Sequence, residues 1–429
     1  MTPTEALAVE AREAGITPLE ALLRRGRLRA TLMMLGPAFV ASIAYVDPGN
    51  FATNVQGGAK FGYLLLWVVL AANLMAMLIQ YLSAKLGIAT DRNLPESFRD
   101  HYPRWLSWGM GVQAEVISMS TDFAEFLGAA LGLNLLFHVP LVVAGVMTGV
   151  IAFGILELRR HGFRPFELGI TALLGIIFLG FLYETLKIGP SASDSLQSFL
   201  PPRLGSTEAI YLAVGIIGAT VMPHAIYLHS ALTQGRMPVH NDAERTRVLR
   251  FERTDVIVAL SLAGIVNMAM LAVAAKLFHG AGLTGVDTIP GAHLAFGNLV
   301  GGGAALAFAV ALLASGASSS SVGTYAGQVV MAGFINLRLS LYIRRIVTMI
   351  PALVVLAVGV SPTSALVLSQ VVLSFGIPFA LIPLVLLSSR RDVMGVHVNK
   401  PLTTWTAWAL AALITGLNVF LLAQTFGLA

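Results

Sequence analysis

DPGN, at residues 47–50, lies inside the first long apolar stretch of this chain, and MPH, at residues 222–224, lies inside the sixth. A helix in lipid must satisfy its backbone polar groups internally, and proline removes a donor and clashes with the preceding turn. We therefore predict that both helices break at these motifs. A charge at the middle of the bilayer costs at least ~2.5–3.5 kcal/mol, so Asp47 is a candidate functional residue. Two broken helices at matching positions of two halves are typical of a transporter's midplane site.

The composition is that of a membrane protein. Of the 429 residues, 56% are hydrophobic and 11% are charged, with a mean hydropathy of +0.79, whereas soluble proteins carry about 25% charged residues. The absence of cysteine excludes disulfides, thiolate metal sites, Fe–S clusters and a catalytic thiol. We attribute the basic pI, about 9.6, to membrane topology signals and expect no nucleic-acid partner.

Apolar windows of about 20 residues predict eleven transmembrane helices. The windows are 31–57, 62–88, 104–132, 135–157, 165–187, 208–234, 253–278, 302–332, 341–360, 363–388 and 402–427. If the N-terminus is cytosolic, all but four of the 27 Lys and Arg residues fall in cytosolic segments, as the positive-inside rule requires. The four exceptions are Lys60, Lys187, Arg203 and Lys276. The sequence therefore predicts an all-α polytopic membrane protein with an external C-terminus.

The predicted helices divide into two halves of opposite topology. Residues 1–30 are polar and lack the cleavage site of a signal peptide, so we interpret them as a cytosolic segment. A first repeat over 31–188 and a second over 208–389 flank an external loop at 189–207, and 390–429 hold helix 11 and an external C-terminus. Because five helices per half is an odd number, the halves form an inverted repeat with helices 1 and 6 broken.

The two breaks carry candidate ligands for a cation. Asp47 and Asn50 offer a carboxylate and a carboxamide oxygen, and the breaks free backbone carbonyls near Ala44 and Ala219. Met222 offers a thioether, which favours softer metals, whereas oxygen ligands suit Mg²⁺, Ca²⁺ and Mn²⁺. This mixture favours a divalent transition metal that is carried through, since structural sites use more charge and His or Cys ligands. The alternative is that Met222 only fills space between helices.

Other polar side chains in the predicted helices allow more than one interpretation. Gln370 can ligate a cation or form a hydrogen bond across helices. For Asn73 and Asn267 we favour interhelical hydrogen bonds, and for the serines of 315–321 we favour close packing of small residues. The chain has no Walker-type phosphate-binding motif, so ATP is not the expected energy source.

Ionisable residues recur in the third, sixth and ninth predicted helices. The candidates for a proton pathway, besides Asp47, are Glu115, Asp122, Glu125, His224, His229, Arg344 and Arg345. Asp122 follows Glu115 by seven residues and Glu125 lies one turn further, so these carboxylates share a helix face. Chains of Asp, Glu and His inside membranes mark proton relays, and histidine titrates near physiological pH. The alternative is a static pairing of the acids with the arginines, or arginines that act only as topology anchors.

Longer motifs surround the breaks: AYVDPGN at 44–50 and GATVMPH at 218–224, with STDFAE at 120–125 and LSQ at 368–370. In these motifs the chain resembles the Nramp family of divalent metal transporters, close to its bacterial manganese-importing branch. The resemblance extends from about residue 33 to residue 425, and the paired break motifs are highly specific for the family.

This resemblance implies an inverted-repeat fold of the LeuT type and a midplane site for Mn²⁺ or Fe²⁺. The implied ligands are Asp47, Asn50 and Met222 with the carbonyl of Ala219 and, in some states, the carbonyl of Ala44 or the side chain of Gln370. It also implies proton co-transport through Asp47, Asp122 and neighbouring acids, modulated by His224 and His229. Related branches without the methionine are associated with Mg²⁺ or Al³⁺, so Met222 argues against those substrates.

We therefore expect a proton-coupled importer of Mn²⁺, and also of Fe²⁺, that acts as a monomer in the bacterial plasma membrane. It would use no cofactor, because the metal ions and protons are its substrates. One alternative is a LeuT-type symporter of amino acids or organic solutes, although Asp47 would repel a substrate carboxylate at the break. Another is a metal-gated channel or sensor, although one carboxylate does not supply the repeated rings of a pore. An enzyme is not expected, since no nucleophile–base pair has a recognisable spacing.

Overall fold

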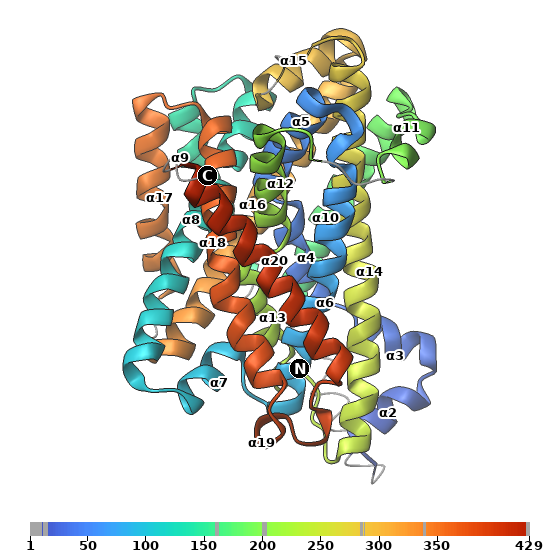
Figure 1. The fold of residues 1–429 in the computed structure, drawn as a ribbon, viewed down its shortest axis with the longest axis vertical. Helices are drawn as coiled ribbons and strands as arrows, with labels where there is room; N and C mark the ends of the chain where they lie inside the picture. The colour runs from blue at the N-terminus through green and yellow to red at the C-terminus, as the bar shows by residue number, and fades with distance from the viewer. Residues whose placement is uncertain are drawn as a thin grey trace.

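The computed structural model describes residues 11, 16–158, 163–199, 204–283, 286, 288–337 and 340–425. Every regular element within these ranges is helical, and most of the long helices run along the vertical axis of Figure 1. Much of the predicted N-terminal segment, residues 1–10 and 12–15, lies outside the described residues. The end of the predicted external C-terminus, residues 426–429, also lies outside them.

The helices follow one another without any intervening sheet in the described ranges. They are α2 (Pro18–Arg24), α3 (Arg27–Met34), α4 (Pro37–Ser42), η1 (Ile43–Val46), α5 (Pro48–Phe61), η2 (Gly62–Leu65), α6 (Leu66–Thr90), α7 (Leu94–His101), α8 (Arg104–Phe137), α9 (Leu141–Leu158), α10 (Phe163–Ile188), α11 (Ala192–Gln197), α12 (Thr207–Thr220), α13 (Pro223–Thr233), α14 (Asp242–Ala274), η4 (Ala275–His279), α15 (Ile289–Leu299), α16 (Gly302–Ile335), α17 (Leu341–Val358), α18 (Pro362–Ser388), α19 (Arg391–Met394), η5 (Gly395–His397) and α20 (Pro401–Thr425).

The lengths and composition of these helices are those of a membrane protein. Among the described residues, eight helical stretches are long and apolar enough to cross a bilayer, and two shorter apolar helices cover Pro37–Val46 and Leu141–Ile155. Each predicted apolar window overlaps a helix of the structure, so the prediction of an all-α polytopic membrane protein is confirmed. The count of eleven spans and the five-plus-five inverted repeat stay predictions.

Two segments that lie between predicted apolar windows contain short helices. Helix α11 begins where the side chain of Ser191 accepts a hydrogen bond from the amide of Asp194, 3.3 Å away. Helix α15 begins in the same way, since Thr288 Oγ1 accepts from the amide of Gly291 at 3.1 Å. These caps were present in the sequence, but the Gly-rich surroundings obscured them. Both helices lie toward the upper end of the bundle in Figure 1.

An aromatic cluster fills the bundle between α5, α10, α15 and α16. The ring of Phe51 lies edge-on to Phe181 and Phe308, with centroids 5.3 and 5.8 Å apart. Phe308 in turn stacks on Phe296 of α15 at 5.1 Å. Offset and edge-to-face rings pack favourably without polar partners. Because Phe51 follows the first break by one turn, this cluster covers the α15 side of the candidate site.

Candidate metal site

The first predicted break is confirmed between η1 and α5. Asp47 has an extended backbone (φ −79°, ψ 169°), and its Oδ1 accepts a hydrogen bond of 2.9 Å from the amide of Asn50. Pro48 occupies the first helical position, where its missing N–H and fixed φ do no harm. Asp–Pro therefore ends one helix and caps the next, which leaves a carboxylate at the junction.

The second predicted break is confirmed between α12 and α13. Helix α12 ends at Thr220, Val221 leaves the helical region (φ −100°, ψ 73°) and Met222 is extended (φ −76°, ψ 122°) before Pro223 starts α13. The proline cannot donate a hydrogen bond to the preceding turn. Carbonyl groups at the end of α12, such as that of Ala219, are therefore open to side-chain donors or to a cation.

The fold brings the two breaks together. Asn50 Nδ2 donates to the carbonyl of Ala219 at 2.9 Å and to Asp47 Oδ1 at 2.6 Å, and Thr220 Oγ1 donates to Asn50 Oδ1 at 3.4 Å. Asp47, Asn50 and Met222 are all fully buried. The second carboxylate oxygen, Asp47 Oδ2, has no hydrogen-bond partner among the described residues. Burying a carboxylate oxygen without a partner costs free energy. A bound cation would provide the partner that this oxygen lacks.

Neighbouring helices bind other carbonyls that the first break frees. Asn267 Nδ2 of α14 donates to the carbonyl of Tyr45 at 2.6 Å, and Ser315 Oγ of α16 donates to that of Val46 at 2.6 Å. The predicted interhelical role of Asn267 is thus confirmed, whereas Ser315 does more than pack closely. Ala44, the predicted occasional ligand, is fully buried within η1, one turn before Asp47.

Gln370 lies against the first turn of α5. A side chain at Gly49 would collide with the carboxamide of Gln370, so this glycine gives the carboxamide the space it occupies beside α5. Gln370 Nε2 donates to Ser369 Oγ at 3.3 Å, while Gln370 Oε1 is buried and has no partner in the described chain. A second unpaired oxygen therefore lies beside the break that holds Asp47.

The acids of α8 separate into a paired group and an unpaired group. Arg344 forms an ion pair with Glu115, and its Nη2 donates to Ser118 Oγ at 2.9 Å. The carboxylate oxygens of Asp122 and Glu125 are buried without a hydrogen-bond partner in the described residues. Arg344 Nη2 lies 4.0 Å from Asp122 Oδ2. Static pairing therefore describes Glu115 well and Asp122 only through this long ion pair, while it leaves Glu125 unexplained.

Arg345 is fully buried on the other side of these acids. Its Nη1 donates to the carbonyl of Ser320 and to Thr324 Oγ1, both at 3.3 Å, and its guanidinium lies 5.8 Å from the ring centroid of Phe126. Glu125 lies within electrostatic range of both Asp47 and Arg345. A line of ionisable groups thus runs from the break along α8 toward Glu115.

The structure separates the two histidines that the sequence analysis grouped together. His224 Nδ1 lies 3.3 Å from Thr121 Oγ1, next to Asp122 on α8. His229 instead lies between Gln80 Oε1 and Glu252 Oε1, each 2.9 Å from a ring nitrogen. Five residues turn an α-helix by about 140° beyond one full turn, so the two rings leave α13 in different directions. Only His224 joins the α8 acids.

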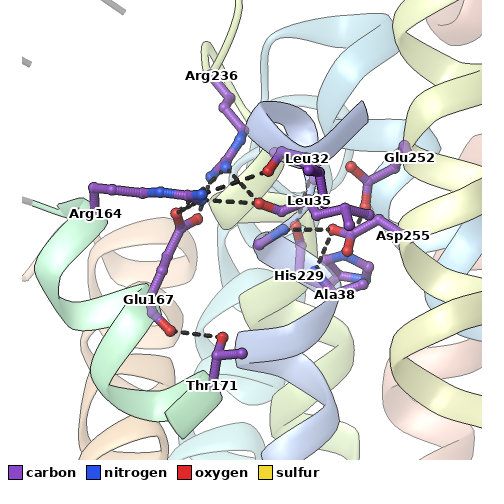
Figure 2. Close-up of polar contacts among 12 residues, drawn as sticks. Leu32, Leu35, Ala38, Arg164, Glu167, Thr171, His229, Arg236, Glu252 and Asp255 are labelled. Atoms are coloured by element: carbon purple, nitrogen blue, oxygen red, sulfur yellow. Dashed lines mark hydrogen bonds and ion pairs between the residues drawn. The ribbon is translucent and has the colours of Figure 1, made fainter. Parts of the chain in front are cut away.

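A polar cluster, shown in Figure 2, binds the start of α4. Asp255 Oδ2 accepts hydrogen bonds from the amides of Gly36 and Ala38, at 3.1 and 2.9 Å. This carboxylate on α14 therefore caps a helix more than 200 residues away in the sequence. Sequence analysis missed it because a remote cap leaves no local motif, apart from the Gly-Pro start of α4, which has no capping side chain of its own.

Two arginines complete the cluster in Figure 2. Arg164 Nη1 donates to Glu167 Oε2 and to the carbonyl of Leu35, both at 2.9 Å. Arg236 pairs with the other oxygen of Glu167. Hydrogen bonds to charged groups contribute about 1.5–3 kcal/mol each, so this cluster holds the α3–α4 junction against α10 and the segment after α13.

The donors at the break suit a cation that binds without a permanent cage. Among the described residues, no three His, Cys, Asp or Glu side chains converge as a metal site. The available donors are one carboxylate, amide and backbone oxygens and a thioether, which together suit a divalent transition metal. All lie out of contact with solvent, so a cation can reach them only after helices move.

The sequence profile of the Nramp family, described as natural resistance-associated macrophage protein-like, matches residues 38–424. The chain is 51% identical over 398 residues to the divalent metal cation transporter MntH of Bacillus subtilis, covering 93% of each chain. It is 52% identical over 400 residues to the protein of the same name from Deinococcus radiodurans, covering 93% of this chain and 92% of the relative.

A solved structure shares the fold. The manganese transporter of Eremococcus coleocola, crystallised with an aromatic bis-isothiourea compound, superposes with a TM-score of 0.84 at 32% identity. The match covers 92% of this chain and 87% of that transporter. The family profile spans both breaks, and the identity to relatives extends over nearly the whole length. The chain therefore belongs to the Nramp family.

Proposed function

We propose that this protein is a proton-coupled importer of divalent transition metals, Mn²⁺ and also Fe²⁺, that works by alternating access. The observation that carries the proposal is the orphaned oxygen Asp47 Oδ2, fully buried between two broken helices. A cation placed there would receive this oxygen as its charged ligand. The names of the relatives from B. subtilis and D. radiodurans, and of the E. coleocola structure, support the same substrate class.

The ligands of the metal come from both breaks. Asp47 Oδ2 supplies charge, Met222 supplies a soft sulfur, and Asn50 supplies its carboxamide oxygen, which accepts a long hydrogen bond of 3.4 Å from Thr220. The carbonyl of Ala219 becomes available when the 2.9 Å bond from Asn50 is exchanged for the metal. Gln370 Oε1, also without a partner in the described chain, is a further oxygen beside the site. Ala44 contributes its carbonyl only in states where η1 has moved.

Protons follow a different route from the metal. Asp122 and Glu125 lie side by side against Gly323, whose added Cβ would fall 2.8 Å from Asp122 Oδ1 and 2.5 Å from Glu125 Oε2. Two buried carboxyl groups that lack hydrogen-bond partners among the described residues, next to a charged site, suit proton transfer better than structural pairing. The approaching metal displaces a proton from Asp47. This proton passes along α8 toward Glu115 and Arg344, and His224 lies beside its route.

Alternating access requires movement at both ends of the site. We infer that the end of the bundle with the cluster of Figure 2 is cytosolic, because the basic residues gather there. Release of the metal to the cytosol then requires that the hydrogen bonds between Asp255 and the start of α4 break. Entry of the metal from outside requires that the aromatic cluster around Phe51 opens. We further infer eleven spans in two inverted repeats in the bacterial plasma membrane, acting as a monomer. A negative-inside potential favours cation entry by ~2.3 kcal/mol per charge per 100 mV.

The direct test is uptake by purified protein in proteoliposomes that contain a pH-sensitive dye. We expect saturable Mn²⁺ entry accompanied by acidification of the lumen, and competition by Fe²⁺. Uptake that does not saturate would favour a channel, and competition by amino acids would favour a LeuT-type solute symporter. Saturable metal entry without any acidification would disprove proton coupling but leave metal transport standing.

Replacing Met222 with alanine is expected to reduce metal selectivity more than Mn²⁺ affinity. The thioether is the only soft donor among the proposed ligands, and oxygen ligands alone bind Ca²⁺ and Mg²⁺ as readily as Mn²⁺. The measurement is inhibition of Mn²⁺ uptake by Ca²⁺ and Mg²⁺ in Met222→Ala. Met75→Ala, at a buried methionine of α6, is the control. Lower Mn²⁺ affinity with unchanged selectivity would contradict the proposed role of the sulfur.

A further inference from the structure

The helices α2 and α3 form a hairpin beside the start of α14, at the lower right of Figure 1. Its apolar side is buried. Leu19 and Leu22 of α2, and Ala30 and Met34 of α3, belong to a core cluster separate from the main one. The residues of the bundle in this cluster are Ile88, Met237, Val248 and Leu249. The hairpin is thus a folded part of the protein, and one of its faces packs against the bundle.

The end of the hairpin lies at the boundary of the membrane-spanning region. Two residues separate Met34 from the apolar helix Pro37–Val46. Arg164, the first residue of the span Arg164–Ile188, donates to the carbonyls of Leu35 at 2.9 Å and Leu32 at 3.5 Å. The apolar helix Pro37–Val46 and the candidate span Arg164–Ile188 therefore both begin near the last turn of α3. We infer that this turn lies at the level of the lipid headgroups.

The exposed residues of the hairpin include three arginines and a leucine. Arg24, Arg25 and Arg29 are exposed, and Leu32 exposes 54% of its surface. Arg29 and Leu32 are three residues apart on α3, so they share a face, whereas Ala30 is buried against the bundle. Basic residues beside an exposed apolar side chain at the interface are typical of elements that bind anionic lipid.

We propose that the outer face of the α2–α3 hairpin binds anionic phospholipids. Arg24 and Arg29 contact the phosphate-bearing headgroups, and Leu32 enters the boundary of the acyl chains. Charge complementarity selects anionic over zwitterionic lipid, and the exposed leucine selects a membrane over a soluble acidic partner. Because only Leu35 and Gly36 separate α3 from α4, bound lipid also fixes the start of the helix that is bound by Asp255. The lipid site itself does not depend on the proposed transport function.

The absence of cysteine in the chain allows a clean test. A fluorophore attached to Leu32→Cys is measured in vesicles of phosphatidylcholine and phosphatidylglycerol, in which one lipid or the other is brominated. We expect stronger quenching by brominated phosphatidylglycerol at equal mole fractions, and loss of this preference at high salt. Val396→Cys, at a 70% exposed position of η5, is the reference and should show no such preference.

Charge variants then identify the arginines as the cause. In Arg24→Gln/Arg29→Gln the preference should fall on the order of fivefold per arginine at low ionic strength, whereas Arg24→Lys/Arg29→Lys should retain it. The matched control Arg391→Gln/Lys400→Gln removes two exposed charges elsewhere and should leave it unchanged. Equal quenching by both lipids at position 32, no quenching there, or an equal effect of the control pair would overturn the proposal. None of these readings requires transport.

Discussion

Asp47→Asn is expected to abolish Mn²⁺ uptake while leaving the fold intact. Asparagine keeps a side-chain oxygen that can accept the 2.9 Å hydrogen bond from the amide of Asn50, so the cap of α5 survives. The variant removes the charge of the orphaned oxygen and with it the only carboxylate at the break. Since changes to outer-shell partners alone reduce metal affinity by about 10–100-fold, loss of this ligand should reduce Mn²⁺ binding by at least about 100-fold.

The measurement is Mn²⁺ binding by calorimetry in detergent, together with the thermal unfolding temperature. Asp392→Asn, which removes an exposed carboxylate far from the break, should bind Mn²⁺ normally. Asp47→Ala should also lose binding, and its unfolding temperature should fall because the cap is lost as well. Normal binding by Asp47→Asn would place the site elsewhere in the chain.

Gly218→Ala is expected to destabilise the protein and to distort the site. Helix α12 packs so closely on α18 that a Cβ at Gly218 would collide with the carbonyl oxygen of Gln370, a backbone atom that cannot rotate away. The helices must separate, which typically costs about 1–3 kcal/mol. The shift would also displace Gln370 and Ala219 from the metal, so both the unfolding temperature and Mn²⁺ affinity should fall.

Gly215→Ala is the matched control for this prediction. It lies one turn earlier on α12, and its added Cβ would meet Thr53 at 3.4 Å and Val371 at 3.7 Å, which are ordinary contacts. Alanine should be neutral or slightly stabilising there, because it favours the helix by up to about 1 kcal/mol over glycine. Equal unfolding temperatures of the two variants would show that the close contact between Gly218 and α18 does not determine how these two helices pack.

The two breaks could be predicted because their causes are local. Proline at 48 and 223 forbids a continuous helix, and a membrane offers the freed groups no water. The position of Asn50 beside Asp47 follows from the first turn of a capped helix. That the Ala219 carbonyl meets Asn50 was implied only by the family resemblance, since contacts between helices leave no local pattern.

The cluster at the start of α4 could not be predicted in this way. Glu167 lies in the second turn of α10 and Asp255 lies near the middle of α14, and nothing in the sequence links them to Gly36. Helix geometry alone could have predicted that His229 and His224 point in different directions. It could not have predicted that Glu252 is the partner of His229. Prediction from sequence thus reached the residues whose role is set by their neighbours in the chain and missed those that act across the bundle.

The proposed transport function requires that a metal binds between the two broken helices. Its most direct test is a crystal structure of the protein with Mn²⁺, with the ion located by anomalous scattering. We expect one strong peak in coordinating contact with Asp47 Oδ2 and the sulfur of Met222, and no peak in Asp47→Asn. A peak between Asp122 and Glu125, with none at the break, would contradict it.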